Sequence, residues 1–446
     1  MKKIDDQISR PTKAGATKSQ QRSLLIKNGH VIDPVNNIDE KMDILVQDGE
    51  IAKLSKDIKG GDAEIIDAKG KYVCPGFIDM HVHLREPGRE DKETIESGTK
   101  AAARGGFTCV LCMPNTQPPI DNEGIVEYVY KQAREKGSVK VYCAACITKG
   151  RAGKELTEME MLARAGAIAL TDDGGSVADT QIMRRAMEYS SMCNLRIIAH
   201  SEDPSLSTGG QMNEGYTSTV LGLKGIPAAA EELMVYRDIS LSKLTGVPIH
   251  ITHISTKGTV ELIRNAKKSG IKVTCDTTPH YIALTEESLK TYDTNFKVNP
   301  PLRSKEDVVS IIEGLKDGTI DAIATDHAPH TDYEKDSEFN DAPCGMIGLE
   351  TAVGICLNEL VQKGVINIST LVSKFTKGPR EILRISNGAI LEGRDADITI
   401  LDLDKEWIVD KKKFQSKARN TPFDTWKLKG AATMTIVAGK VVHSEF

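Results

Sequence analysis

Two histidines separated by one residue give the first indication of chemistry in this sequence. His81 and His83 end an apolar run at 77–83 that has the composition of a buried strand. Successive side chains of a strand point to opposite faces, so both imidazoles lie on one face and form a chelating pair. Neutral imidazole is a common ligand of Zn²⁺ and similar divalent ions.

Four further candidate ligands end or follow strand-like runs later in the chain: His200, His253, Asp173 and Asp326. A single histidine at a strand end is more often a hydrogen-bonded structural residue, but the convergence of several favours a metal site. A carboxylate at 173 could bridge two ions. Two ions about 3.5–4 Å apart activate water and polarise a carbonyl together. The pattern therefore predicts metal-assisted attack on a carbonyl group.

Polar residues near the histidine pair indicate what the substrate carries. Arg85 comes two residues after His83, and its guanidinium suits a carboxylate that accepts two hydrogen bonds. Asn115 follows the next apolar run and offers an amide that donates and accepts. Taken alone, Arg85 could equally be a structural ion-pair residue. Beside a metal pair, it predicts a substrate with a free carboxylate.

The middle of the chain repeats one unit, a short apolar strand, a polar loop and an amphipathic helix. Strands alternating with helices predict a parallel sheet, and eight units predict closure into a (β/α)₈ barrel of the TIM type. The carboxyl ends of such strands form the rim where active sites are built. Strands are expected at 77–83, 108–113, 139–147, 167–171, 196–200, 249–254, 272–275 and 321–325, and helices at 93–104, 124–135, 181–190, 231–244, 259–268 and 306–316.

Both ends of the chain have a different character from the middle. Short alternating runs at 24–66 and 396–442 predict strands, with turn signals at 27–29 and 47–49. We expect a small β-sandwich domain built from 23–73 and 389–446, beside a barrel at 74–388. Residues 1–22 are polar and are interpreted as a flexible tail.

Composition excludes several classes of protein. Lys and Arg number 58 against 63 Asp and Glu, a balance that argues against a dedicated nucleic-acid binder. No apolar run approaches the ~18–20 residues of a membrane helix. Nine cysteines without an export signal predict reduced thiols in a cytoplasmic protein. The two CxxC pairs, at 109–112 and 143–146, lie in apolar runs, which favours buried structural thiols over a zinc ribbon.

Seven segments carry a resemblance to a known family. The segment GFIDMHVHLREPG at 76–88 resembles the signature of the cyclic amidohydrolases within the amidohydrolase superfamily. The order and spacing of the whole set resemble the dihydroorotase family in its class I bacterial form, over about 24–442. The other segments are MPNT at 113–116, TDDG at 171–174, AHSED at 199–203, THIST at 252–256, NPPLR at 299–303 and ATDHAPH at 324–330.

The resemblance implies a reaction and a role for each site residue. The reaction is the reversible ring closure of N-carbamoyl-L-aspartate to L-dihydroorotate in pyrimidine (UMP) biosynthesis, with one or two Zn²⁺ ions and a count of two favoured. His81 and His83 would hold one zinc, His200 and His253 the other, and Asp173 would bridge them. Asp326 would be a ligand and the general acid and base. The implied substrate contacts are Arg85, Asn115, Asn299, His330, Cys344 and Gly345.

Two features separate this sequence from its relatives. Hydantoinases, allantoinases and several dihydroorotases resemble one another in a carboxylated lysine bridge, whereas the strand at 167–171 has no lysine and Asp173 stands near it. This favours the class I reading. Family members often have Pro-Phe-Gly where this chain has Pro343-Cys344-Gly345, which puts the usual aromatic contact in doubt.

Two alternatives stay open from the sequence. One is another cyclic amidohydrolase, a hydantoinase, dihydropyrimidinase or allantoinase. The other is a silent barrel that serves as a structural partner of aspartate carbamoyltransferase, and intact ligands argue against silence but not against such a complex. The resemblance also suggests a homodimer. The polar loop at 330–348 is either a lid over the site or an exposed connection.

Overall fold

The computed structural model describes residues 23–445, and the expected tail at 1–22 lies outside this range. Eight parallel strands pair in chain order, and His83 N–H donates to the His327 carbonyl over 2.9 Å to bring the last strand beside the first. This nearly closed barrel confirms the predicted fold class. Its strands are β6 (Phe77–Val82), β7 (Phe107–Cys112), β8 (Lys140–Ala145), β9 (Ala169–Leu170), β10 (Arg196–Ala199), β13 (Ile249–Ile251), β14 (Val273–Thr277) and β15 (Ala322–Ile323).

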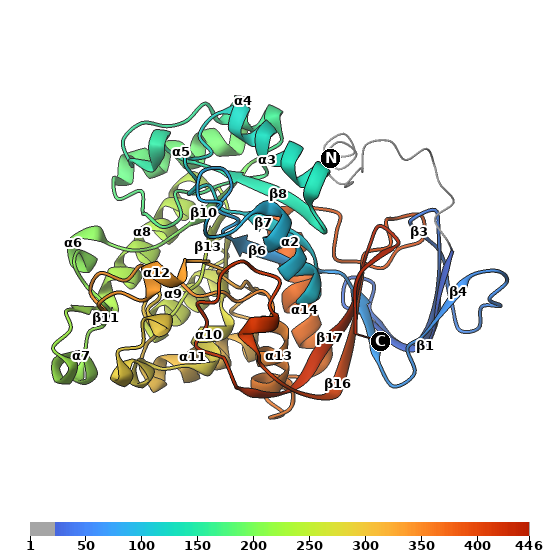
Figure 1. Cartoon of the computed structure of the whole chain (residues 1–446). Helices are drawn as coiled ribbons and strands as arrows, with labels where there is room; N and C mark the ends of the chain where they lie inside the picture. Colours follow the sequence, from blue (N-terminus) through green and yellow to red (C-terminus); the bar gives the residue numbers. More distant parts are fainter. Residues whose placement is uncertain (1–22, 446) are drawn as a thin grey trace.

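Helices follow the strands and cover the outside of the barrel (Figure 1). Polar caps mark their starts: Asn122 accepts from the Ile125 amide before α3, and Ser304 forms a capping box with Asp307 before α11. All six expected helices are present. The helices of this layer are α2 (Ile95–Arg104), α3 (Glu123–Lys136), α4 (Met159–Ala165), α5 (Thr180–Met192), α8 (Ala229–Thr245), α9 (Lys257–Lys268), α11 (Lys305–Asp317), α14 (Ile368–Phe375) and α15 (Lys377–Leu383).

Short elements occupy the long connections, most of them after a barrel strand. Since active sites of such barrels form from these loops, the insertions lie where a substrate is enclosed. They are η1 (Lys149–Arg151), α6 (Pro204–Ser207), β11 (Met212–Asn213), α7 (Tyr216–Leu221), β12 (Gly225–Ile226), α10 (Pro279–Ala283), η2 (Glu286–Thr291), η3 (Thr294–Phe296), α12 (Asp332–Lys335), α13 (Ala352–Cys356) and η4 (Leu357–Val361).

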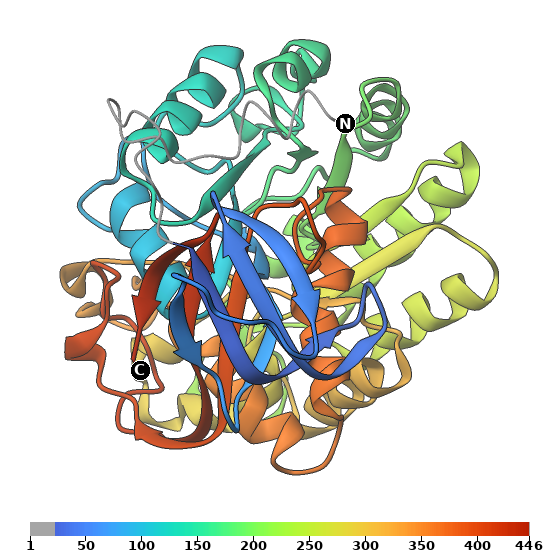
Figure 2. The same ribbon diagram turned by 90° about the vertical axis from the view of Figure 1, so that its right-hand side faces the viewer.

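A second sheet joins the two ends of the chain beside the barrel (Figures 1 and 2). Its spatial order is β18-β17-β16-β5-β1-β2-β3, with β4 also paired to β1, and its buried face encloses an aliphatic cluster. The strands are β1 (Leu24–Asp33), β2 (Ile38–Gln47), β3 (Glu50–Ser55), β4 (Glu64–Asp67), β5 (Tyr72–Pro75), β16 (Ile398–Ile408), β17 (Lys427–Val437) and β18 (Lys440–Ser444). The limits proposed for the two domains stay a prediction.

One of the two expected turns is a different feature. Asp48 and Gly49 form the two-residue turn between β2 and β3, with φ of 52° and 84°. The signal at 27–29 is instead a bulge inside β1, where the register shifts between Ile26 and Gly29 and Asn28 has a φ of 64°. Asn28 and a glycine satisfy a bulge as well as a turn, so local composition does not distinguish the two.

The cysteines of the two CxxC pairs are buried in the barrel wall. Cys109, Cys112, Cys143 and Cys146 are free thiols, and burial raises the pKa of Cys146 to about 13. These findings confirm structural cysteines rather than a zinc ribbon. None of the helices within 23–445 has the length and apolar character that crossing a membrane requires.

Candidate active site

The six predicted metal ligands meet at the carboxyl ends of the barrel strands. His81 lies in β6, and the others lie in the segments that directly follow a strand. All six side chains are buried. They are His81, His83, Asp173, His200, His253 and Asp326.

Asp173 lies between two pairs of histidines. Its Oδ2 atom is 3.3 Å from Nε2 of His81 and 3.5 Å from Nε2 of His83. Its Oδ1 atom is 3.6 Å from Nδ1 of His200 and 3.4 Å from Nε2 of His253. Each carboxylate oxygen therefore faces one histidine pair, the arrangement that a bridging carboxylate needs.

Asp326 belongs to one side of this cluster. Its Oδ1 atom is 3.0 Å from Nε2 of His83 and 3.5 Å from Nε2 of His81. The backbone at Asp326 is left-handed, with a φ of 49°, and His253 has a φ of 40°. Non-glycine residues pay for this conformation, and such strain concentrates at functional sites. Here it accompanies two side chains that point into the cluster.

The donor set fits divalent metal ions. Two groups within the described residues bring ligand atoms within 4.8 Å of one another, and they share Asp173: His81, His83 and Asp173, and Asp173, His200 and His253. Nε2 of His81 and Oδ1 of Asp173 are buried and make no hydrogen bond. Buried polar atoms without partners are costly, and a cation that both atoms coordinate would remove that cost.

The charges point the same way. Despite its burial, the neighbouring imidazoles hold the pKa of Asp173 well below its usual value, because His81, His200 and His253 surround it. Asp173 and Asp326 in turn raise the pKa of His81 to about 9, against the opposing effect of burial. The carboxylates thus prefer a positive neighbour, and a divalent cation replaces imidazolium protons in that role.

Polar side chains behind the histidines orient their rings. Nδ1 of His83 donates to Oδ1 of Asn115 over 2.7 Å, so its Nε2 lone pair faces the cluster. Nδ1 of His81 lies 2.9 Å from the hydroxyl of Thr252. Asn115 therefore orients a histidine as well as lining the cavity. Thr252 lies within the THIST segment, but nothing in the sequence indicated that it contacts His81.

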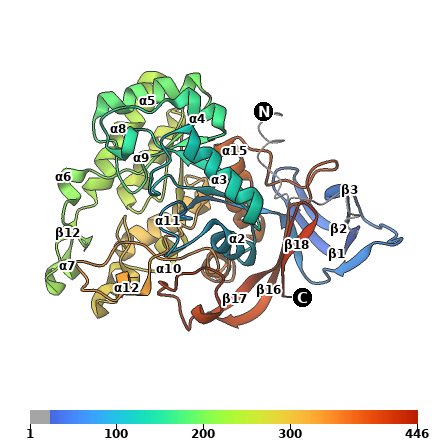
Figure 3. The same cartoon turned by 45° about the horizontal axis from the view of Figure 1, so that its top comes forward.

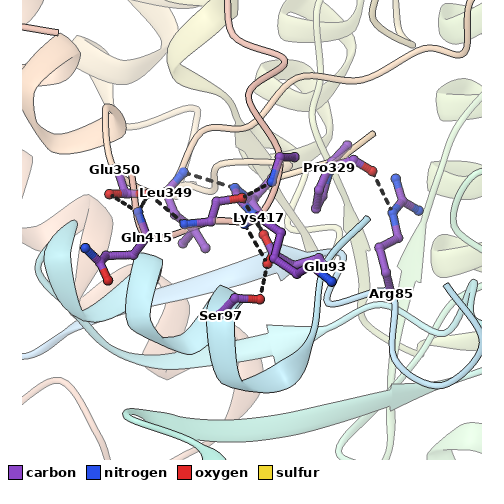
Figure 4. Close-up of polar contacts among 12 residues, drawn as sticks. Arg85, Glu93, Ser97, Pro329, Leu349, Glu350, Gln415 and Lys417 are labelled. Atoms are coloured by element: carbon purple, nitrogen blue, oxygen red, sulfur yellow. Dashed lines mark hydrogen bonds and ion pairs between the residues drawn. The ribbon is translucent and has the colours of Figure 1, made fainter. Parts of the chain in front are cut away.

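A cavity of about 340 Å³ opens beside the cluster, and the structure brings all six predicted substrate contacts into its lining. Arg85 has a left-handed backbone, and its Nε–H donates to the Pro329 carbonyl over 3.1 Å. Figure 4 shows Arg85 beside Pro329, apart from the contacts around Glu93. The six residues are Arg85, Asn115, Asn299, His330, Cys344 and Gly345.

His330 is neutral in this cavity. Burial, with help from the cations Arg85 and Lys92, lowers its pKa to about 2. Lys92 Nζ lies 3.2 Å from Nδ1 of His330, so the lysine donates and Nδ1 accepts. The ring proton then lies on Nε2 and is donated to the Cys344 carbonyl over 2.9 Å. Lys92 is a residue that sequence reasoning missed, because its place beside His330 depends on loop packing.

The carboxyl-terminal part of the chain fixes the segment around Asp326. His327 lies next to Asp326, and its Nε2 atom is 3.3 Å from the Glu93 carboxylate. Glu93 also accepts from the Lys417 amide over 3.1 Å, as Figure 4 shows. Glu350 accepts from the Gln415 amide over 2.8 Å in the same view. Sequence separation of more than 300 residues hides these contacts from local patterns.

The polar loop at 330–348 is fastened over the cavity rather than left exposed. Lys335 is buried, and its Nζ donates to the carbonyls of Pro343 (2.9 Å) and Gly345 (3.1 Å). Asn420 donates to the Gly345 carbonyl from the other side, over 3.1 Å. The tip of the loop at Cys344 is exposed and lines the cavity.

A barrel with this histidine and aspartate cluster at the carboxyl ends of its strands defines an enzyme class, the amidohydrolase-type barrels. The solved L-hydantoinase (dihydropyrimidinase) from Arthrobacter aurescens superposes with a TM-score of 0.86 at 28% identity, over 95% of this chain and 96% of that one. A second solved structure, a D-hydantoinase, superposes with a TM-score of 0.83 at 24% identity, over 95% of each chain.

Sequence comparisons define the family within that class. A family model described as dihydro-orotase-like matches residues 70–259. The dihydroorotase of Acetivibrio thermocellus is 54% identical over 95% of this chain and 99% of its own length, and that of Geobacter metallireducens is 52% identical over 94% and 99%. The chain belongs to the dihydroorotase family and is a cyclic amidohydrolase.

Proposed function

We propose that this enzyme catalyses the reversible, zinc-dependent cyclisation of N-carbamoyl-L-aspartate to L-dihydroorotate in UMP biosynthesis. The observation that carries the proposal is the position of Asp173, whose two oxygens face separate histidine pairs within a cavity that also contains Arg85. A dinuclear centre beside a guanidinium suits a cyclic amide that bears a carboxylate, which hydantoin and allantoin lack.

We assign one zinc to His81, His83 and Asp326 and the other to His200 and His253, with Asp173 shared. When bound, the zinc ions acidify water and polarise the ring carbonyl. Oδ1 of Asp326 faces His83, so its Oδ2 atom is assigned the proton transfer. The histidines keep the pKa of Asp326 below its usual value despite burial, so in hydrolysis the ionised carboxylate accepts a proton from water.

Asp326 then delivers that proton to the leaving ring nitrogen. In the direction of ring closure the carboxyl must start protonated, so a lower pH favours cyclisation. We assign Arg85 to the substrate carboxylate, with Asn115 and His330 as neutral hydrogen-bonding partners. Asn299 contacts the ring, and the backbone at Cys344 and Gly345 closes the cavity.

The test is a substrate panel on the purified, zinc-loaded enzyme. L-Dihydroorotate is offered beside hydantoin, dihydrouracil and allantoin, and the metal content is determined on the same sample. We expect turnover of L-dihydroorotate and little of the others. Turnover of hydantoin or dihydrouracil without L-dihydroorotate would refute the proposal in favour of the hydantoinase alternative.

Two assembly states and a location belong to the same proposal, because the family resemblance suggests them. We propose a cytoplasmic homodimer, and a complex with aspartate carbamoyltransferase in addition to activity. Light scattering of the purified chain measures the first state. Co-elution with purified aspartate carbamoyltransferase measures the second, and separate elution at micromolar concentration would contradict it.

A further inference from the structure

A second cavity lies at the opposite end of the barrel from the metal ligands. It has a volume of about 340 Å³ and is formed where β10, β13 and β14 begin and where α14 and α15 cross the barrel. Helix α14 contacts β1, and α15 lies on the side of the barrel that faces the terminal sheet (Figure 3). Catalytic residues of such barrels come from the other end, so this cavity is separate from the active site.

Positive charge dominates the cavity lining. Its cations are Arg196, Lys272, Lys374 and Lys377, and its carboxylates are Asp321 and Glu381. Asp321 is already paired, because Lys267 lies 2.6 Å away and the Cys275 amide donates to it over 2.9 Å. None of the four cations has a carboxylate of residues 23–445 within ion-pair distance. A chain with a net charge of −5 thus concentrates unpaired cations in one hollow.

Two of these cations are held in place by the fold. Lys374 is 8% exposed, and its Nζ donates to the carbonyl of Ile320. Nε of Arg196 donates to the Ile382 carbonyl over 3.1 Å, which leaves its terminal nitrogens for another acceptor. Burial lowers the pKa of Arg196 to about 10, so it is still protonated at neutral pH. A buried cation without a carboxylate is costly unless an anion comes to it.

The remaining lining shapes the rest of the ligand. Pro248, Val273 and Ile382 provide an apolar wall beside the cations. The His250 imidazole is already satisfied, since Nδ1 lies 2.9 Å from the Thr274 hydroxyl and Nε2 lies 2.8 Å from Asp276. The ligand charge is therefore met by lysine and arginine. We propose that this cavity binds a small phosphate monoester, with the dianion among the cations and an apolar ring against the wall.

Calorimetric titration of the zinc-loaded enzyme with phenyl phosphate tests the proposal. The variant Lys272→Gln/Lys377→Gln removes two exposed cations of the cavity. The control Lys131→Gln/Lys154→Gln removes two exposed lysines elsewhere and changes the net charge equally. We expect the cavity variant to bind about tenfold more weakly and the control to bind like the wild type. Inorganic phosphate should bind more weakly than phenyl phosphate, because it lacks the ring.

Three results would overturn the proposal. The first is no binding of phenyl phosphate to the wild type at millimolar concentration. The second is equal affinity of the cavity variant and the control. The third is binding that survives in the cavity variant but is lost in Asp173→Ala, since that outcome places the phosphate on the active-site metals.

Discussion

Replacing Arg85 by glutamine should weaken substrate binding with little effect on the chemical step. The guanidinium lies in the cavity lining, and Pro329 engages only its Nε atom. Burial lowers the pKa of Arg85 to about 10, so the group is still charged at pH 8. A charged hydrogen bond is worth about 1.5–3 kcal/mol, which corresponds to a rise in KM of about 10- to 150-fold.

Steady-state hydrolysis of L-dihydroorotate by the variant and the wild type gives KM and kcat separately. The matched control is Arg89→Gln, which removes a guanidinium from the same loop whose charge is paired with Asp91 (3.0 Å) and Glu334 (2.9 Å). We expect the control to change KM by less than about threefold. An unchanged KM in Arg85→Gln, or a loss confined to kcat, would refute the role given to Arg85.

Three further outcomes follow from the site. Asp326→Asn should lower kcat by about 10²- to 10⁴-fold while zinc stays bound, and turnover near the wild-type rate with metal present would contradict its proton-transfer role. Since the pKa of His330 is about 2, His330→Asn should leave the shape of the KM profile unchanged between about pH 5.5 and 8.5; a titration near 6.5 that only the wild type shows would count against a neutral imidazole. Gly345→Ala should lower the melting temperature and cost about 1–3 kcal/mol, because Gly345 has a φ of 133° and its new Cβ would lie 2.7 Å from Cβ of Ala328; the control Gly364→Ala, with a φ of 69° and nothing within 4 Å, isolates the clash, and equal losses would exclude it.

The barrel and its metal ligands are the parts that local sequence patterns predict well. Strand residues alternate, and the ends of parallel strands meet on one rim, so His81, His83 and Asp173 could be placed together from their positions alone. The expected strand at 139–147 is only Lys140–Ala145 in the structure, but that difference leaves the rim intact.

The environment of the site depends on contacts that no local pattern contains. Lys92 reaches His330 across 238 residues of sequence, and Lys417 reaches Glu93 across 324. The bulge at Asn28 looks like a turn because both features favour the same residues. The cationic cavity combines strand starts with two late helices, and only the folded chain brings Arg196 and Lys374 together.

Zinc stoichiometry tests most directly the claim that one carboxylate organises two ions. Equilibrium dialysis of the wild type against buffered zinc, with the metal quantified on the same protein, should give two ions per chain, in line with the two ligand groups that share Asp173. Asp173→Ala should bind the second ion far more weakly and lose activity with it. Equal zinc content and equal affinity in both proteins would contradict the bridging role of Asp173.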